Sequence, residues 1–217
     1  MLAALARALR LTGDERDHLY FLAGRQPPRT HHRAVHVSPA LLYVLDALEG
    51  APATVVSDLN EVLVQNALAR ALLGDGPRYT GMERSITYRW FADPAKRDRS
   101  PAEDHAQVGR TYVADLRATW ARRRGDADVE ALVARLSEVS EEFRDLWDRH
   151  EVAVRRADTK RVVHPLVGTV ELDCEVLFTT EGDQGLVLLT ARPGTEAREQ
   201  LEMLRVVGLQ DMSVAGA

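Results

Sequence analysis

Cysteine is nearly absent from this 217-residue chain: Cys174 is the only one, which excludes an internal disulfide. No apolar run approaches the roughly 20 residues that a bilayer-spanning helix needs, so we expect no membrane partner. The net charge of -5 argues against non-specific nucleic-acid binding by the chain as a whole. A glycine-rich phosphate loop, a dinucleotide fingerprint and an H-E-x-x-H motif are also missing. We therefore predict no catalytic residue, no cofactor and no metal, and we expect a cytoplasmic location.

The most informative stretch runs from Ser140 to Leu177 and begins with a short helix. Ser140 is placed to cap the helix N-terminus, and Glu141 and Glu142 follow in the first turn, where the helix dipole favours anions. Bulky side chains three and four positions apart share one face: Phe143, Leu146 and Trp147. The pattern predicts a helix that packs an aromatic face against the rest of the domain.

From Thr169 to Phe178 the sequence alternates strictly between apolar and polar residues. One face carries Val170, Leu172, Cys174, Val176 and Phe178. The other carries Thr169, Glu171, Asp173 and Glu175. A period of two is typical of a strand with one buried and one solvent-facing side. Cys174 is then expected to act as a small hydrophobic side chain rather than as a nucleophile.

Two ordered motifs in this stretch carry a resemblance to a known family. They are S-x-E-F-R-x-L-W-x-x-H-x-V from Ser140 and H-P-x-V-G-x-x-x-L from His164. They resemble the ligand-binding domain of MmyB-like bacterial transcription regulators, and the resemblance covers roughly Val37 to Leu204. It implies a PAS-like sensor fold that normally follows a helix-turn-helix DNA-binding domain. It also implies a sensor of long apolar molecules such as fatty acids.

The order strand, strand, helices, strand, strand, strand, helix matches that fold. We predict an α+β domain over residues 38–208, with a five-stranded antiparallel sheet covered by helices on one face. A linker over residues 25–37 precedes it, and a tail over residues 209–217 follows. The linker holds His31, His32 and His36 without the carboxylates or cysteines that would complete a metal site.

Residues 1–24 resemble the last two helices of the family's DNA-binding domain. Thr12 to Glu15 predicts a capping box, and Gly24 predicts a left-handed helix end. The helix-turn-helix pair that would enter the major groove would lie before Leu2 and is missing from this sequence. A shortened piece of the gene, a misplaced start codon and a natural standalone sensor would each explain its absence. DNA binding is expected only through that missing domain.

Within the main domain, the apolar runs Ala53–Val56 and Val62–Gln65 predict a hairpin, and a helix is expected over Ala67–Leu73. Asn66, between strand and helix, is either the helix N-cap or a polar group in the sensor cavity. A second hairpin with a basic tip is predicted from Val152–Val154 and Arg161–Val163.

A long helix is expected over Pro101–Arg124, and its basic triplet from Arg122 to Arg124 is interpreted as a solvated end. His150 is interpreted as a cation that neutralises a helix C-terminus, and His164 as a hydrogen-bonding group at a strand end. A last helix is expected from Thr195, ending near Gly208.

Large aromatic side chains among many small residues predict a cavity under the covering helices, although a filled core is the alternative. Its walls are expected to be the aromatic helix after Ser140 and the strand from Val170 to Phe178. Arg84 is a candidate for holding a carboxylate head group through two parallel hydrogen bonds, with an exposed helix-start arginine as the alternative. The full set of predicted ligand-binding residues is Asn66, Arg84, Tyr88, Trp90, Phe91, Phe143 and Trp147.

The leading hypothesis is a non-catalytic sensor domain that binds a small apolar ligand, such as a fatty acid, and signals allosterically to DNA binding. A ligand-free dimerisation module is the second hypothesis, and a small enzyme is the third. A homodimer is expected because operators are two-fold symmetric.

Overall fold

The computed structural model describes residues 1–25, 36–151, 158–179 and 182–214. The chain divides into two compact units, residues 1–33 and 34–217. In the first unit, α1 (Leu2–Ala8) is followed by α2 (Gly13–Leu22). The Thr12 hydroxyl accepts a hydrogen bond from Glu15 N, and the Glu15 carboxylate accepts from Thr12 N at 2.8 Å. The predicted capping box is therefore confirmed, and Gly24 adopts the expected left-handed conformation with φ +67°.

The second unit is built on a sheet that has five antiparallel strands among the described residues, in the order β2-β1-β5-β4-β3. The strands are β1 (Ala53–Ser57), β2 (Val62–Gln65), β3 (Asp158–His164), β4 (Gly168–Phe178) and β5 (Gln184–Thr190). This topology confirms the predicted α+β class and PAS-like sheet. In β4 the predicted alternation holds from Val170 to Glu175, because Val170, Leu172 and Cys174 are buried whereas Glu171 and Glu175 are exposed. It fails at the end of the strand, where Phe178, predicted on the buried face, is exposed.

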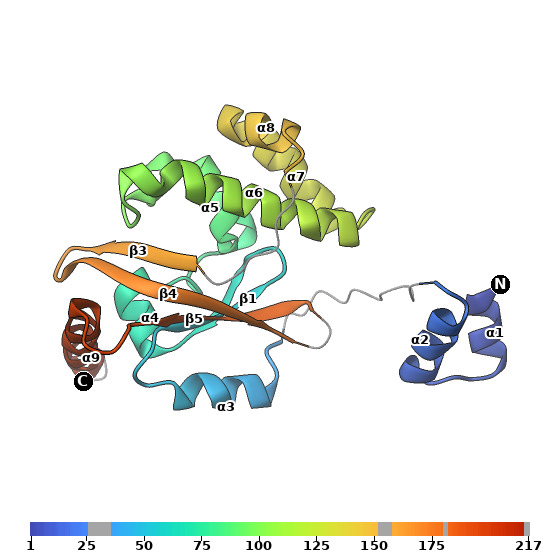
Figure 1. Cartoon of the computed structure of the whole chain (residues 1–217), viewed down its shortest axis with the longest axis horizontal. Coiled ribbons are helices and arrows are strands. Elements are labelled where there is room, and N and C mark those ends of the chain that lie inside the picture. The colour runs from blue at the N-terminus through green and yellow to red at the C-terminus, as the bar shows by residue number, and fades with distance from the viewer. Residues whose placement is uncertain (26–35, 152–157, 180–181, 215–217) are drawn as a thin grey trace. The chain divides into compact units, whose positions relative to one another are not determined.

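Helices lie on both sides of this sheet. The longer ones are α3 (Pro39–Ala47), α4 (Ala67–Leu73), α5 (Ile86–Ala92), α6 (His105–Arg122), α7 (Ala127–Val139), α8 (Glu141–Asp148) and α9 (Glu196–Val214). In Figure 1, α5 to α8 gather above the sheet, and α3 runs along its lower side. The expectation that helices cover only one face was therefore wrong. Leu45 of α3 packs with Val55 and Leu186 on the second face.

The buried apolar residues of the second unit form three clusters within the described ranges. The first lies among α5 to α8 and includes Phe91, Leu136 and Phe143. The second joins α4 and α9 to β3, β4 and β5, and the third joins α3 to β1 and β5. The first cluster contains no residue of the five strands. The side chains that lie between the α5–α8 layer and the sheet include those that line the cavity described below.

Several element ends differ from the sequence prediction. β3 begins at Asp158, inside the segment that was predicted to be the hairpin tip, and Val152–Val154 lie outside the described residues. The long helix begins at His105, after a 3-10 turn from Ala102 to Asp104. α9 continues to Val214, past the predicted end near Gly208.

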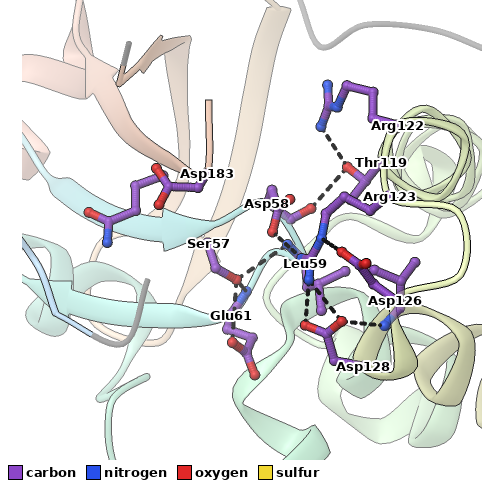
Figure 2. A network of polar contacts seen from close by, with 12 residues as sticks. Ser57, Asp58, Leu59, Glu61, Thr119, Arg122, Arg123, Asp126, Asp128 and Asp183 are labelled. Carbon is purple, nitrogen blue, oxygen red and sulfur yellow. Dashed lines mark hydrogen bonds and ion pairs between the residues drawn. The ribbon is translucent and has the colours of Figure 1, made fainter. Parts of the chain in front are cut away.

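The basic triplet at the end of α6 is not uniformly solvated. Arg122 and Arg124 are exposed, but the Arg123 side chain is only 6% exposed. Figure 2 shows its guanidinium between the β1–β2 turn and the start of α7, and it binds Asp58 at 2.9 Å, Asp126 at 3.0 Å and Asp128 at 2.7 Å. The solvated-end interpretation was therefore wrong for this residue. Residue spacing alone does not reveal that three carboxylates from two elements converge on it.

Candidate functional site

A cavity of about 350 Å³ lies between the sheet and the α5–α6 layer. The register of the sheet explains which strand residues reach it. Thr54 pairs with Val187, and these two residues together with Val56 and Leu189 occupy alternate positions that face the same side. Further apolar lining comes from Val62, Leu73, Ile86, Val108 and Val162. The sheet side of the cavity is therefore a mostly aliphatic wall.

The other lining residues are strongly cationic. Five arginines and both lysines of the chain line the cavity: Arg78, Arg89, Arg97, Arg99, Arg161, Lys96 and Lys160. The acidic lining residues are Asp75 and Asp98. A cavity with aliphatic and cationic parts favours a molecule with an apolar body and an anionic group.

Three of these cations are held by carboxylates. Arg161 binds Asp104 at 2.5 Å and Glu103 at 3.1 Å. Arg97 binds Glu142 at 2.7 Å. The third is Lys96, whose Nζ lies 3.6 Å from Glu83 and 3.9 Å from Asp93.

The remaining four cations are Arg78, Arg89, Arg99 and Lys160, and none of them forms an ion pair with a carboxylate of the described residues. Arg89 donates from Nη1 to the carbonyls of Glu83 and Arg84, and Arg99 donates to the Leu72 carbonyl at 2.7 Å. These bonds orient the guanidinium groups without neutralising them. An anion in the cavity would supply the missing charge.

Tyr79 is the centre of a group of these cations. The charged ends of Arg78, Arg89 and Lys96 lie 5.2, 4.3 and 5.0 Å from its ring centroid. A hydrogen bond from Arg78 lowers the Tyr79 pKa, burial works against this, and the charges of Arg78, Lys96 and Arg89 lower the pKa further. Burial lowers the pKa of the Arg89 guanidinium. The two shifts indicate that cations lie close to Tyr79 and that Arg89 is partly removed from water.

Three lining residues also bear buried polar atoms without a hydrogen-bond partner in the described structure. They are Thr54 Oγ1, Asn60 Oδ1 and Trp90 Nε1. An unsatisfied buried group costs roughly 1–3 kcal/mol, so this packing is less favourable than one in which these atoms find partners. Among the described residues, most of the buried side-chain polar atoms that lack a hydrogen bond therefore belong to residues that line the cavity.

Of the predicted ligand-binding residues, Trp90 lines the cavity. Asn66 is the N-cap of α4: its Oδ1 accepts from Ala69 N at 2.8 Å and Ala53 N at 3.1 Å. Its Nδ2 donates to the carbonyls of Leu48 and Ala51 at 2.7 and 2.8 Å. All four hydrogen bonds of this side chain are therefore structural, and Asn66 is not among the lining residues.

The other predicted residues also lie outside the lining. Arg84 is half-buried at the end of a 3-10 turn (Gly81–Arg84), and its carbonyl accepts from Arg89. Tyr88 packs against the cluster among α5 to α8. The remaining three aromatics contact one another in that cluster: Phe143 meets Phe91 edge-on at 5.3 Å and stacks on Trp147 at 5.4 Å between ring centroids. Neither α8 nor β4, the two expected walls, contributes a lining residue.

Sequence reasoning missed Arg89, Arg99 and Lys160. A signal for Arg89 was present, because Ile86, Arg89 and Trp90 stand three and four positions apart and line the cavity together. The scarcity of lysine was a second signal, since Lys96 and Lys160 are the only two in the sequence. No sequence pattern brings Arg99 to the cavity, because its position depends on a main-chain bond from Val163 N to Arg99 O at 2.9 Å.

The two histidines near the family motifs have structural partners. Arg117 Nη1 donates to His150 Nδ1 at 3.0 Å, and Arg117 Nη2 donates to the Trp147 carbonyl. The Arg117 guanidinium therefore places a positive charge at the end of α8, where the helix dipole favours a cation. His164 bonds the Ala71 carbonyl of α4 at 3.1 Å, and burial lowers its pKa.

Over the described ranges, no three His, Cys, Asp or Glu side chains come close enough to hold a metal ion. No helix within those ranges has the length and apolar character to cross a membrane. His31 and His32 lie outside the described residues.

Residues 37–204 match a family described as MmyB-like transcription regulator ligand binding domain, and this segment contains the whole sheet and every cavity residue. A search of curated proteins finds no match to the chain.

Proposed function

This chain belongs to the MmyB-like transcription regulator ligand-binding domain family, and from that membership we propose that its cavity binds an amphiphilic molecule such as a fatty acid. One observation carries the proposal. The cavity of about 350 Å³ combines an aliphatic wall with four cations that lack a carboxylate partner among the described residues. Ligand sites commonly enclose roughly 300–1,000 Å³. An acyl chain suits the wall, and an anionic head suits the cations.

The charges around the cavity favour Arg89, Arg99 and Lys160 as head-group ligands over Asn66 and Arg84. The two arginines each donate from Nη1 to a main-chain carbonyl, and within the described residues neither forms an ion pair with a carboxylate. A guanidinium in this state can hold a carboxylate through two parallel hydrogen bonds. Lys160 adds a third cation from β3.

The energetics suit a chain of moderate length. Burying about ten methylenes at roughly 0.8 kcal/mol each contributes roughly 8 kcal/mol. Association costs at least about 4 kcal/mol of this. The head group must be paired, because an unpaired charge in such a cavity would cost more than the chain contributes.

Signalling is proposed to be allosteric. The lining comes from β1, β2, β3 and β5 on one side and from α5 and α6 on the other. A ligand that touches both favours one arrangement of the helical layer on the sheet, and its differential affinity for the two arrangements sets the size of the response. DNA binding would be carried by a helix-turn-helix domain attached to the N-terminal unit, in the cytoplasm, and no catalytic role is proposed.

The binding proposal is tested with the full chain in two steps. First, solvent extraction and mass spectrometry of the purified protein should identify a co-purified acyl compound, and calorimetry with dodecanoic acid should show saturable binding. Second, Arg89→Gln should weaken that binding at least about tenfold, as expected for loss of one charge-assisted contact, whereas exposed Arg124→Gln should not. An empty extract together with no calorimetric binding would contradict the proposal.

The allosteric proposal needs the DNA-binding domain. With a helix-turn-helix domain joined upstream of Met1, operator affinity should change when dodecanoic acid is added, and the change should be lost in Arg89→Gln. An operator affinity that stays the same when dodecanoic acid is bound would contradict the signalling role, but it would not contradict the proposed ligand binding.

A second function, dimerisation, is favoured by the apolar surface of α3, where three neighbouring side chains are exposed: Leu42, Tyr43 and Val44. Homodimers are common among regulators that bind two-fold symmetric operators. Sedimentation should show a dimer that Tyr43→Glu converts to a monomer. A monomeric wild-type chain would contradict this role.

A further inference from the structure

We infer that the head group bound in this cavity carries two negative charges close together, as a phosphate monoester does, rather than the single charge of a carboxylate. The inference rests on the proposed function and sharpens its ligand class to phosphorylated amphiphiles. It starts from the number and placement of the cations around the cavity.

The charge count exceeds what a carboxylate can neutralise. In the described part of the chain, seven cationic and two acidic side chains line the cavity. Three of the cations bind carboxylates, which leaves Arg78, Arg89, Arg99 and Lys160 without such a partner. The acidic lining residues Asp75 and Asp98 offset two of these four charges, and one carboxylate would offset only one of the remaining two. A phosphate monoester brings about 1.5 to 2 negative charges at pH 7 and three strong acceptor oxygens.

The placement of the cations also favours a compact dianion. Arg78, Arg89 and Lys96 surround one ring, that of Tyr79, at 4.3 to 5.2 Å from its centroid. These three side chains come from three separate segments, before α5, within α5 and after it. Cations brought this close repel one another, and an anion that touches several of them at once relieves the repulsion.

The chemical character of the residues fits phosphate as well. Arginine forks bind phosphate oxygens through paired N–H groups, and lysine adds a point charge. A hydrogen bond from Arg78, assisted by the charges of Arg78, Lys96 and Arg89, lowers the Tyr79 pKa despite burial. The aliphatic wall of Val56, Val187 and Leu189 remains available for the chain that carries the phosphate.

The test compares three probes on the full chain by calorimetry: dodecyl phosphate, dodecanoic acid and inorganic phosphate. At pH 7.5 we expect dodecyl phosphate to bind about tenfold more tightly than dodecanoic acid, as one further charge-assisted contact would give, and to lose more affinity with added salt. Equal or weaker binding of dodecyl phosphate would overturn the inference, while dodecanoic acid binding would keep the proposed function. Binding of neither amphiphile would defeat both. Inorganic phosphate that binds as tightly as dodecyl phosphate would also overturn the inference, because the site would then take a free anion.

Two further measurements, a change of pH and a variant of Arg78, test whether the second negative charge of the head group is required. A phosphate monoester loses its second charge near pH 6, so the preference for dodecyl phosphate should shrink between pH 7.5 and 5.5. A preference that stays constant would contradict the two-charge requirement. Arg78→Gln, at an exposed position that should not disturb folding, should weaken dodecyl phosphate severalfold more than dodecanoic acid. Arg124→Gln is the control, and an equal effect of Arg78→Gln on both probes would overturn the assignment.

Discussion

The strongest stability prediction concerns Arg123, which joins the β1–β2 turn to the junction of α6 and α7. Its side chain is 6% exposed and binds three carboxylates, of which Asp58 is 9% exposed and Asp126 and Asp128 are 39% and 25% exposed. Burial lowers the Arg123 pKa, but the carboxylates of Asp128, Asp126 and Asp58 outweigh it, and the net shift is upward. Arg123→Gln removes the cation that binds the buried carboxylate of Asp58.

The expected loss follows from that burial. Removing one partner of a buried ion pair typically costs 3–5 kcal/mol, and we expect the lower end, about 3 kcal/mol, because Asp126 and Asp128 can turn toward water. For a unit of this size, about 3 kcal/mol corresponds to a fall of roughly 6–12 °C in the melting temperature. The neighbours in the same triplet, Arg122 and Arg124, are exposed, and their replacement by glutamine should cost less than about 1 kcal/mol.

Urea unfolding followed by tryptophan fluorescence is the assay. The three tryptophans of the chain, Trp90, Trp120 and Trp147, lie in α5, α6 and α8 and so report on unfolding of the helical layer. Arg123→Gln should lower the free energy of unfolding far more than Arg124→Gln. If the two variants fall within about 0.5 kcal/mol of each other, the reasoning about a compensated buried charge is refuted.

Two further predictions concern residues with structural hydrogen bonds. Because burial lowers the His164 pKa from 6.5, the unfolded chain takes up the proton first as the pH falls, so this residue stabilises the fold above about pH 6.5 and loses that contribution at lower pH. The free energy of unfolding should therefore fall less between pH 7.5 and 5.5 in His164→Gln than in the wild type, and an equal fall would contradict this. Asn66→Ala should destabilise the domain by about 2 kcal/mol through loss of the α4 cap and its loop contacts, with dodecanoic acid affinity unchanged by calorimetry. Weakened binding in an undestabilised Asn66→Ala would instead place this residue in the site.

Local features of the fold were predictable from the sequence. The capping box at Thr12 and the N-cap at Ser140 depend on residues three positions apart, and the β4 alternation depends on a period of two. Such signals depend only on residues that are close in the sequence, so they do not depend on how distant segments pack. The five-stranded sheet followed from their order along the chain and from the family resemblance.

The cavity was less predictable, because its lining is set by packing between distant segments. Helical periodicity placed Phe143 and Trp147 on an inward face, but that face packs against α5 and α6 instead of a ligand space. Arg99 reaches the cavity only because its main chain pairs with β3, more than sixty residues later. Arg123 illustrates the same limit, since its neighbours in the triplet are exposed and nothing local distinguishes it.

The location of the ligand can be measured directly, because both lysines of the chain line the cavity. Acetylation by a water-soluble amine reagent, followed by peptide mass spectrometry, reports Lys96 and Lys160 separately, with the α-amino group of Met1 as the internal reference. With increasing dodecanoic acid, labelling of Lys160 and Lys96 should fall along the calorimetric binding curve while labelling of Met1 stays constant. Undiminished labelling of both lysines at saturating ligand would show that the molecule binds somewhere other than this cavity.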